Sequence, residues 1–248
     1  TLTTSSANGS VTLANSIELA DGASGGLTLN TGDGAVSIAG AVGQRGALSR
    51  FLVNQYSGSG AASIGTASVA GSIAAGEIGL NTTTLAGSAT LQGDSIVLRG
   101  ALGSDATDRS NRLTLQSLTN GAALALGSGA GATDLGQIQG YFSELVIGSA
   151  NPAERGAVTV DGSDGTGTTD NAIRLYADTL VVSAGTLGSN SSILLDTTGS
   201  MTVAAGSGDA VVAADDLTIR FRGGSGTTLE FNRALKGGNI QLDPLNAA

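Results

Sequence analysis

The chain has 248 residues, a formal net charge of −9, 40 glycines, 3% aromatic residues, and neither cysteine nor histidine. Without Cys and His, the usual zinc sites and every Ser/His or Cys/His nucleophile arrangement are excluded. The 11 basic residues form no cluster along the sequence, which argues against nucleic acid or an anionic membrane as a partner. No apolar run approaches the roughly 18 residues of a membrane helix, so membrane insertion is not expected.

From residue 1 to 40, short blocks with alternating apolar residues follow one another, separated by turn residues such as Asn8-Gly9 and Asp21-Gly22. Alternation indicates strands, and Gly, Asn and Asp supply the turns. Two-residue turns could also close hairpins, which keeps an antiparallel sandwich or barrel open. The blocks are shorter than typical hairpin strands of about five to six residues, and this favours a stacked coil. The blocks are 11–13, 17–19, 27–29 and 36–38.

Three stretches depart from this pattern: 45–60, 101–112 and 127–156. In the first, Leu48, Phe51 and Leu52 have three- and four-residue spacing, which predicts a short helix or loop packed over the end or side of the coil stack. The second is polar, and the third is polar or aromatic. We expect all three to be irregular insertions in one structural unit that spans residues 1–248.

The clearest repeat lies in residues 173–221. Ile173 to Ile193 is a step of 20 residues, and Leu180 to Met201 and Ile219 to Ile240 are steps of 21. Such a period is expected when two or three short strands and their turns complete one coil. The sequence therefore predicts an all-β, right-handed parallel β-helix, a solenoid of about 20 residues per coil. About twelve coils at a strand spacing of about 4.8 Å would give a rod roughly 60 Å long.

The short IxL and VxV blocks with AG, TGS and GSGD turns resemble the filamentous-haemagglutinin-like exoproteins. These are bacterial surface or secreted adhesins built on a parallel β-helix and exported by two-partner secretion. The family's secretion domain carries NPNG- and NPNL-like motifs, whereas Asn151-Pro152 is followed here by Ala153. The first residues lack a signal-peptide pattern. The resemblance therefore implies an internal shaft segment of a longer chain.

One adjacent acidic pair, Asp215-Asp216, precedes the block 217–219. Paired carboxylates can cleave glycosidic bonds, and β-helices host polysaccharide hydrolases and lyases. The pectin-hydrolase pattern, however, joins its acidic residues to a Gly-His-Gly segment, and this chain has no histidine. A turn role for Asp215 is favoured, and no catalytic residue is predicted.

A second acidic group, Asp161, Asp164 and Asp170, lies in a glycine-rich loop. Loops rich in oxygen ligands and glycine suit calcium, the one cofactor considered. The loop lacks the EF-hand spacing and the GGxGxD repeat, so a solvated turn is favoured over a calcium site.

The few aromatic residues are the candidates for carbohydrate binding, and Tyr141-Phe142 is the best pair because it lies in an irregular stretch, where loops carry recognition. The alternative is that these rings fill or cap the core.

Taken together, the pattern favours a structural or adhesive segment of a bacterial surface or secreted β-helical exoprotein, a rigid shaft that displays binding loops. Its expected partners are a glycan or protein on a host or neighbouring cell, or other copies of itself. Two alternatives stay open: a polysaccharide-processing enzyme on the same scaffold, and a self-associating filament subunit that pairs through open sheet edges.

Overall fold

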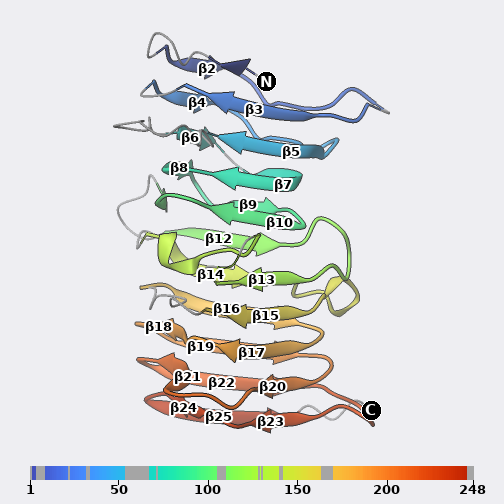
Figure 1. Cartoon of the computed structure of the whole chain (residues 1–248), viewed down its shortest axis with the longest axis vertical. Coiled ribbons are helices and arrows are strands. Elements are labelled where there is room, and N and C mark those ends of the chain that lie inside the picture. Colours follow the sequence, from blue (N-terminus) through green and yellow to red (C-terminus); the bar gives the residue numbers. More distant parts are fainter. Residues whose placement is uncertain are drawn as a thin grey trace.

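The chain folds into a stack of short parallel strands with its two ends at opposite ends of the stack (Figure 1). The computed structural model describes residues 2–3, 9–21, 23–31, 34–53, 67–70, 72–104, 110–127, 129, 131–139, 142–162 and 170–244. Every strand pair in these ranges is parallel. The parallel β-helix is therefore confirmed, and the antiparallel alternative is wrong.

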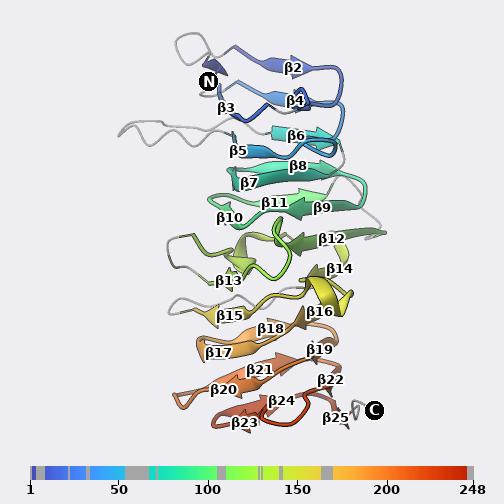
Figure 2. The ribbon, with the colours of Figure 1, turned by 90° about the vertical axis from the view of Figure 1, so that its right-hand side faces the viewer.

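The strands form three faces, which the chain visits in the fixed order A, B, C (Figures 1 and 2). Face A comprises β1 (Leu2–Thr3), β3 (Gly26–Asn30), β5 (Leu48–Val53), the second half of β7 (Ile73–Leu80), β10 (Ser95–Leu98), β13 (Leu124–Leu126), β15 (Val158–Asp161), β17 (Leu180–Ala184), β20 (Met201–Val203) and β23 (Leu229–Phe231). Face B comprises β2 (Val11–Leu13), β4 (Val36–Ile38), β6 (Ala67–Ala70), β8 (Thr83–Ala86) and β11 (Leu102–Ser104), then β18 (Leu187–Ser189), β21 (Asp209–Ala213) and β24 (Ala234–Lys236).

Face C carries the longest unbroken ladder. It begins with the bridges from Ile17 to Val42 and from Val42 to Ile73. Its strands are the first part of β7, β9 (Ala89–Gln92), β12 (Asn111–Gln116), β14 (Phe142–Ile147), β16 (Ala172–Ala177), β19 (Ile193–Thr197), β22 (Asp216–Phe221) and β25 (Asn239–Pro244). Two bridged residues and eight strands give ten levels in the described chain, a stack about 45 Å high at about 4.8 Å per level. This is shorter than the rod expected from twelve coils.

The core is a continuous column of aliphatic side chains from all three faces. Alternation turns every second residue inward, and parallel pairing then stacks equivalent residues from successive coils. One column on face C consists of Leu113, Leu145, Ile173, Ile193 and Leu217, which are paired in register and fully buried. Each such side chain contributes roughly 1.5–3 kcal/mol by its burial, so stability comes from stacking and not from any one coil.

Coil length varies more than the sequence repeat predicts. The pairings of Ile173 with Ile193 and of Leu180 with Met201 are confirmed. The third prediction is wrong, because Ile240 pairs with Leu217, two residues before Ile219. Between paired strands, the step between partner residues ranges from 16, from Val69 to Leu85, to 34, from Leu124 to Val158. The extra residues lie between the strands; the ladder of face C continues past them, whereas the ladders of faces A and B are each divided into two sheets.

All three predicted insertions contain residues of regular strands. Residues 48–53 form β5, with Leu48 and Phe51 in the core, so the predicted helix or loop is wrong there; residues 54–60 lie outside the described chain. In the stretch 127–156, strand β14 is an ordinary level of face C. Irregular structure remains on either side of it, in the single 3₁₀ turns η1 (Leu135–Gln137) and η2 (Pro152–Glu154). Of the 101–112 stretch, residues 102–104 and 111–112 lie in strands β11 and β12 and 105–109 are outside the described chain.

The segment before η1 connects the two sheets of face A, one of which ends at β10 while the other begins at β13. Thr133 bridges to Leu126 of β13, and its Oγ1 donates a hydrogen bond of 2.7 Å to the carbonyl of Ile96 in β10. Since β10 and β13 are not themselves paired, this one residue joins the two ladders of face A. No helix within the described ranges is long and apolar enough to cross a bilayer.

The last coil leaves its core positions open. Ile240 and Leu242 of β25 continue the columns of Leu217 and Ile219, yet they are 49% and 52% exposed. The filament alternative, which would cover such side chains with another copy, stays a prediction.

Candidate binding groove on face C

The outward side chains of face C form three columns that run along the stack. The first column contains Arg112 and Glu144, the second Thr114, Val146, Arg174, Leu194 and Thr218, and the third Tyr176, Asp196, Arg220 and Asp243. Their order follows directly from strand register, because residues two apart on a strand point to the same side. Polar residues that are far apart in the sequence thus share one surface.

Three arginines, one from each column, lie on a diagonal across this face. Arg112 is in β12, Arg174 is two levels further along in β16, and Arg220 is two levels further again in β22. Each step is about 9.6 Å along the stack and about 7 Å across it, so successive Cα atoms are about 12 Å apart. The coil winding therefore produces an evenly spaced line of arginines.

Two shallow hollows lie along this line. One, of about 290 Å³, is lined in part by Arg174, Asp216 and Arg220. The other, of about 320 Å³, is lined in part by Arg112, Arg174 and Tyr176. Both are lined by Glu144 and Arg174, so the two hollows adjoin at this ion pair; together they are called the groove, which crosses strands β9 to β22.

Two of the three groove arginines lie beside carboxylates, and all three remain open to solvent. Arg174 forms an ion pair with Glu144 across the ladder, and a side-chain hydrogen bond with Tyr176, followed by the Glu144 carboxylate, raises the pKa of Arg174. Arg220 lies 3.6 Å from Asp243, and both side chains are well exposed. Arg112 is exposed. Each guanidinium carries five N–H donors, so a ligand can bond to the donors that face the groove.

Residues 148–150 form one edge of the groove. A largely buried cluster of Arg155, Asp196 and Arg222 holds this edge in place. Arg155 Nη1 donates to Asp196 Oδ1 at 2.8 Å, and both side chains are only 2% exposed. Arg222 donates to both Asp196 oxygens, at 2.9 and 3.0 Å. The Arg155 guanidinium also bonds to the carbonyls of Ser149 and Ala150.

The same cluster reaches the third column of the groove. The guanidinium of Arg155 lies 5.2 Å from the centroid of the Tyr176 ring, a cation–π contact. Burial alone would raise the pKa of Asp196, but hydrogen bonds from Arg222 and Arg155 and their positive charges outweigh it and hold the pKa below the ordinary value. Asp196 is therefore a carboxylate at neutral pH, and the edge of the groove is fixed to β19.

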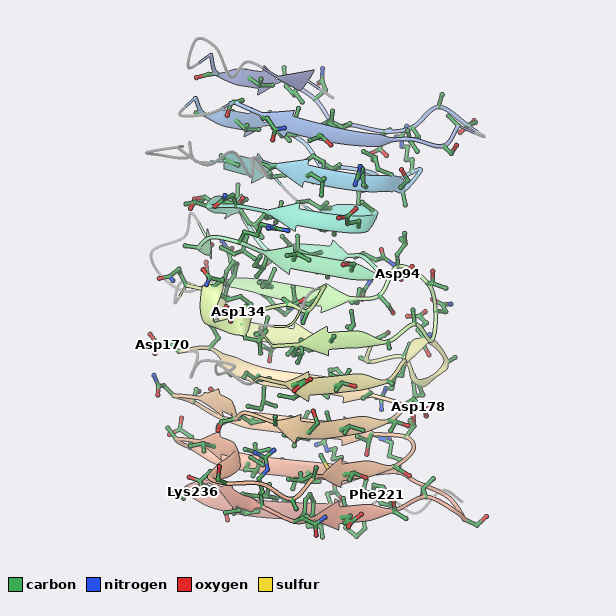
Figure 3. The ribbon with its side chains drawn as sticks, in the orientation of Figure 1. Asp94, Asp134, Asp170, Asp178, Phe221 and Lys236 are labelled. Carbon is green, nitrogen blue, oxygen red and sulfur yellow. The ribbon has the colours of Figure 1, made fainter. Side chains whose placement is uncertain are left out.

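The acidic residues predicted for calcium are not brought together by the described chain. Asp161 ends β15 and is exposed, and Asp170 lies at a lateral edge of the stack (Figure 3), where Asn190 donates to it at 2.6 Å. Asp164 lies outside the described residues. Across the described ranges, no three His, Cys, Asp or Glu side chains gather as metal ligands. The calcium site stays a prediction.

Of the aromatic pair predicted to bind carbohydrate, Phe142 is 1% exposed and packs in the core at the start of β14. Its proposed role as a sugar-binding ring is wrong, because a ring must be accessible to stack on a sugar. Tyr141 lies outside the described residues.

The acidic pair lies at the entry to β22. Asp215 is exposed at the turn, where its carbonyl accepts from Gly238 N at 2.6 Å. Asp216 is the first residue of the strand and lines the groove.

Sequence reasoning missed the groove arginines because they are 62 and 46 residues apart. The signal that could have found them is local: Arg112, Arg174 and Arg220 each immediately precede or follow an inward apolar residue of a strand, as in Ile173-Arg174-Leu175. Only the observed register places them on one line.

Comparison of the chain with protein-family models, with curated proteins and with solved structures finds no match.

Proposed function

We propose that this chain is a rigid, adhesive shaft segment of a bacterial surface or secreted exoprotein of the filamentous-haemagglutinin-like kind, and that face C provides its contact surface. The observation that carries the proposal is the unbroken ladder of face C, from Ile17 to β25, whose outward side chains line the two adjoining hollows of the groove. A stack in which every level pairs with the next is stiff along its whole length.

Anchoring between levels supports the shaft role. Arg233, in the turn between β23 and β24, donates to the carbonyl of Ala204 at 3.0 Å, of Gly185 at 2.9 Å and of Val182 at 3.3 Å. One guanidinium thereby ties its own coil to the two preceding coils. Such side-chain links resist separation of the coils in a way that backbone pairing of neighbours alone does not.

The test is attachment of protein-coated beads to cells. Lys236 is the only lysine of the chain, and it lies on face B, at a corner of the stack (Figure 3), so amine coupling there leaves face C free. We expect coated beads to attach to bacterial or epithelial cells above the level of albumin-coated beads. Attachment at the albumin level would contradict the adhesive role, and release of reducing sugar from polysaccharides by the soluble chain would favour the enzyme alternative.

A further inference from the structure

We propose that the groove on face C binds a linear, carboxylate-bearing glycan, laid obliquely across the strands along the line from Arg112 through Arg174 to Arg220. The inference rests on the proposed adhesive function and names the ligand class of that same surface. It starts from the even spacing of the three arginine positions along the strands, because an extended polymer with regularly repeated carboxylates can meet evenly spaced arginines in one alignment.

The charge of the groove differs from that of the whole chain. The two hollows are lined by three arginines and two carboxylates, Glu144 and Asp216, whereas the chain has 11 basic and 20 acidic residues. Glu144 is paired with Arg174, and Arg220 lies 3.6 Å from a third carboxylate, that of Asp243, so the three arginines are matched by three carboxylates. The groove is therefore a strip of balanced charge on an acidic protein, and its guanidinium donors meet an anion without the net negative charge of the rest of the chain.

The chemistry of the lining suits a carboxylated sugar better than a simple polyanion. Beside Arg112 and Arg220, on the same strands, Thr114 and Thr218 supply hydroxyl groups, which can donate to and accept from sugar hydroxyls. Guanidinium groups bond to carboxylates in a bidentate manner. Tyr176, held by Arg155 from the side of the groove edge, adds a ring to the strip. A glycan that carries both carboxylates and hydroxyl groups along its whole length matches all three kinds of group.

The edge at residues 148–150 sets the direction of the ligand. It borders the hollow that contains Arg112 and Tyr176, and the buried pair of Arg155 with Asp196 fixes it. A polymer that follows the arginine diagonal passes along this edge and continues into the second hollow. We expect the bound segment to be about 24 Å long, the span of two diagonal steps.

The experiment measures binding of an oligogalacturonate of six sugars to the intact chain by calorimetry, with cellohexaose and poly-glutamate as comparison ligands. The variant Arg112→Gln/Arg174→Gln/Arg220→Gln removes the diagonal. The control Arg50→Gln removes an arginine from face A whose exposure, 51%, matches the 52% of Arg174 and which likewise pairs with a glutamate, Glu77. Thermal melting confirms that each variant is folded.

We expect each single Arg→Gln change in the groove to weaken oligogalacturonate binding about threefold, as an exposed ion pair does, and the triple variant to lose about 30-fold or more. Arg50→Gln should bind within twofold of the parent chain, and added salt should weaken binding.

Unchanged binding by a folded triple variant, or equal binding of cellohexaose, would overturn the inference. Equal binding of poly-glutamate would show a surface that selects charge alone, and would overturn it as well. If no oligogalacturonate binds but the coated beads still attach to cells, the ligand class is wrong and the adhesive role stands. If neither occurs, both proposals fail.

Discussion

Replacement of Asp196 by asparagine should destabilise the fold through Arg155. The substitution preserves the shape of the side chain but leaves a guanidinium that is 2% exposed without its counter-charge. Breaking a buried ion pair in this way costs about 3–5 kcal/mol. Arg155 keeps its bonds to two backbone carbonyls and its contact with Tyr176, and Arg222 is 37% exposed and can be rehydrated. We therefore expect a loss near the lower end, about 3–4 kcal/mol.

A loss of this size should lower the melting temperature by roughly 10 °C, since a chain of this length loses about 2–4 °C per kcal/mol. The assay is thermal melting followed by circular dichroism at pH 7. The matched control is Asp178→Asn, at an exposed turn where the carboxylate only accepts from Thr198 at 3.0 Å; it should cost about 0.5 kcal/mol or less.

A second variant separates the buried charge from the loss of contacts. Asp196→Leu/Arg155→Met removes both charges and should recover most of the stability that Asp196→Asn loses, because well-packed apolar pairs replace buried ion pairs at little cost. The reasoning would be refuted if Asp196→Asn melted within about 2 °C of the parent chain, or if it matched Asp178→Asn.

Three further outcomes are expected. Because the folded-state pKa of Asp196 is lowered, the stabilisation that its carboxylate provides is complete above the unfolded-state pKa of about 3.9 and disappears as the pH falls below that value. The melting temperature of the parent chain should therefore drop more steeply below about pH 4 than that of Asp196→Asn. Parallel curves for the two proteins would count against this. Gly148→Ala should lower the free energy of unfolding in urea by at least about 2 kcal/mol more than Gly208→Ala does. Both glycines have positive φ, +79° and +77°, but only at Gly148 would the new Cβ collide with a backbone oxygen, that of Tyr176. Similar losses for the two variants would remove the steric argument. Arg233→Ala should cost about 2 kcal/mol, and Arg233→Lys should restore less than half of it because one ammonium cannot span three carbonyls; full rescue by lysine would show that charge alone matters.

The strands themselves could be predicted from the sequence because alternation marks inward residues locally. Register was harder. Ile219 and Leu217 both face inward, and a shift of two residues keeps every side chain on its own side of the sheet, so alternation could not choose between them as the partner of Ile240. The variable corners, which make one step 16 residues and another 34, remove any fixed period that might have decided the pairing.

Strand β5 was misread for a related reason. Leu48 and Phe51 are both buried but three residues apart, because the two residues between them are exposed. Three-residue spacing of apolar residues imitates a helix when a strand breaks its own alternation.

The groove was beyond sequence reasoning, since it depends on register over five levels. Phe142 was hard to place for a similar reason: alternation from Leu145 and Ile147 points it outward, but a register shift at the start of β14 turns it into the core.

The link made by Arg233 has a mechanical consequence. A solenoid pulled from its C-terminal end can peel one coil at a time, and each coil then gives way at the force needed to break its own ladders. Arg233 bonds to carbonyls of the two preceding coils, so the last coil cannot detach until those bonds break as well. Under tension the peeling front should therefore pause at this point, and the unfolding force should rise to a peak that Arg233→Ala removes.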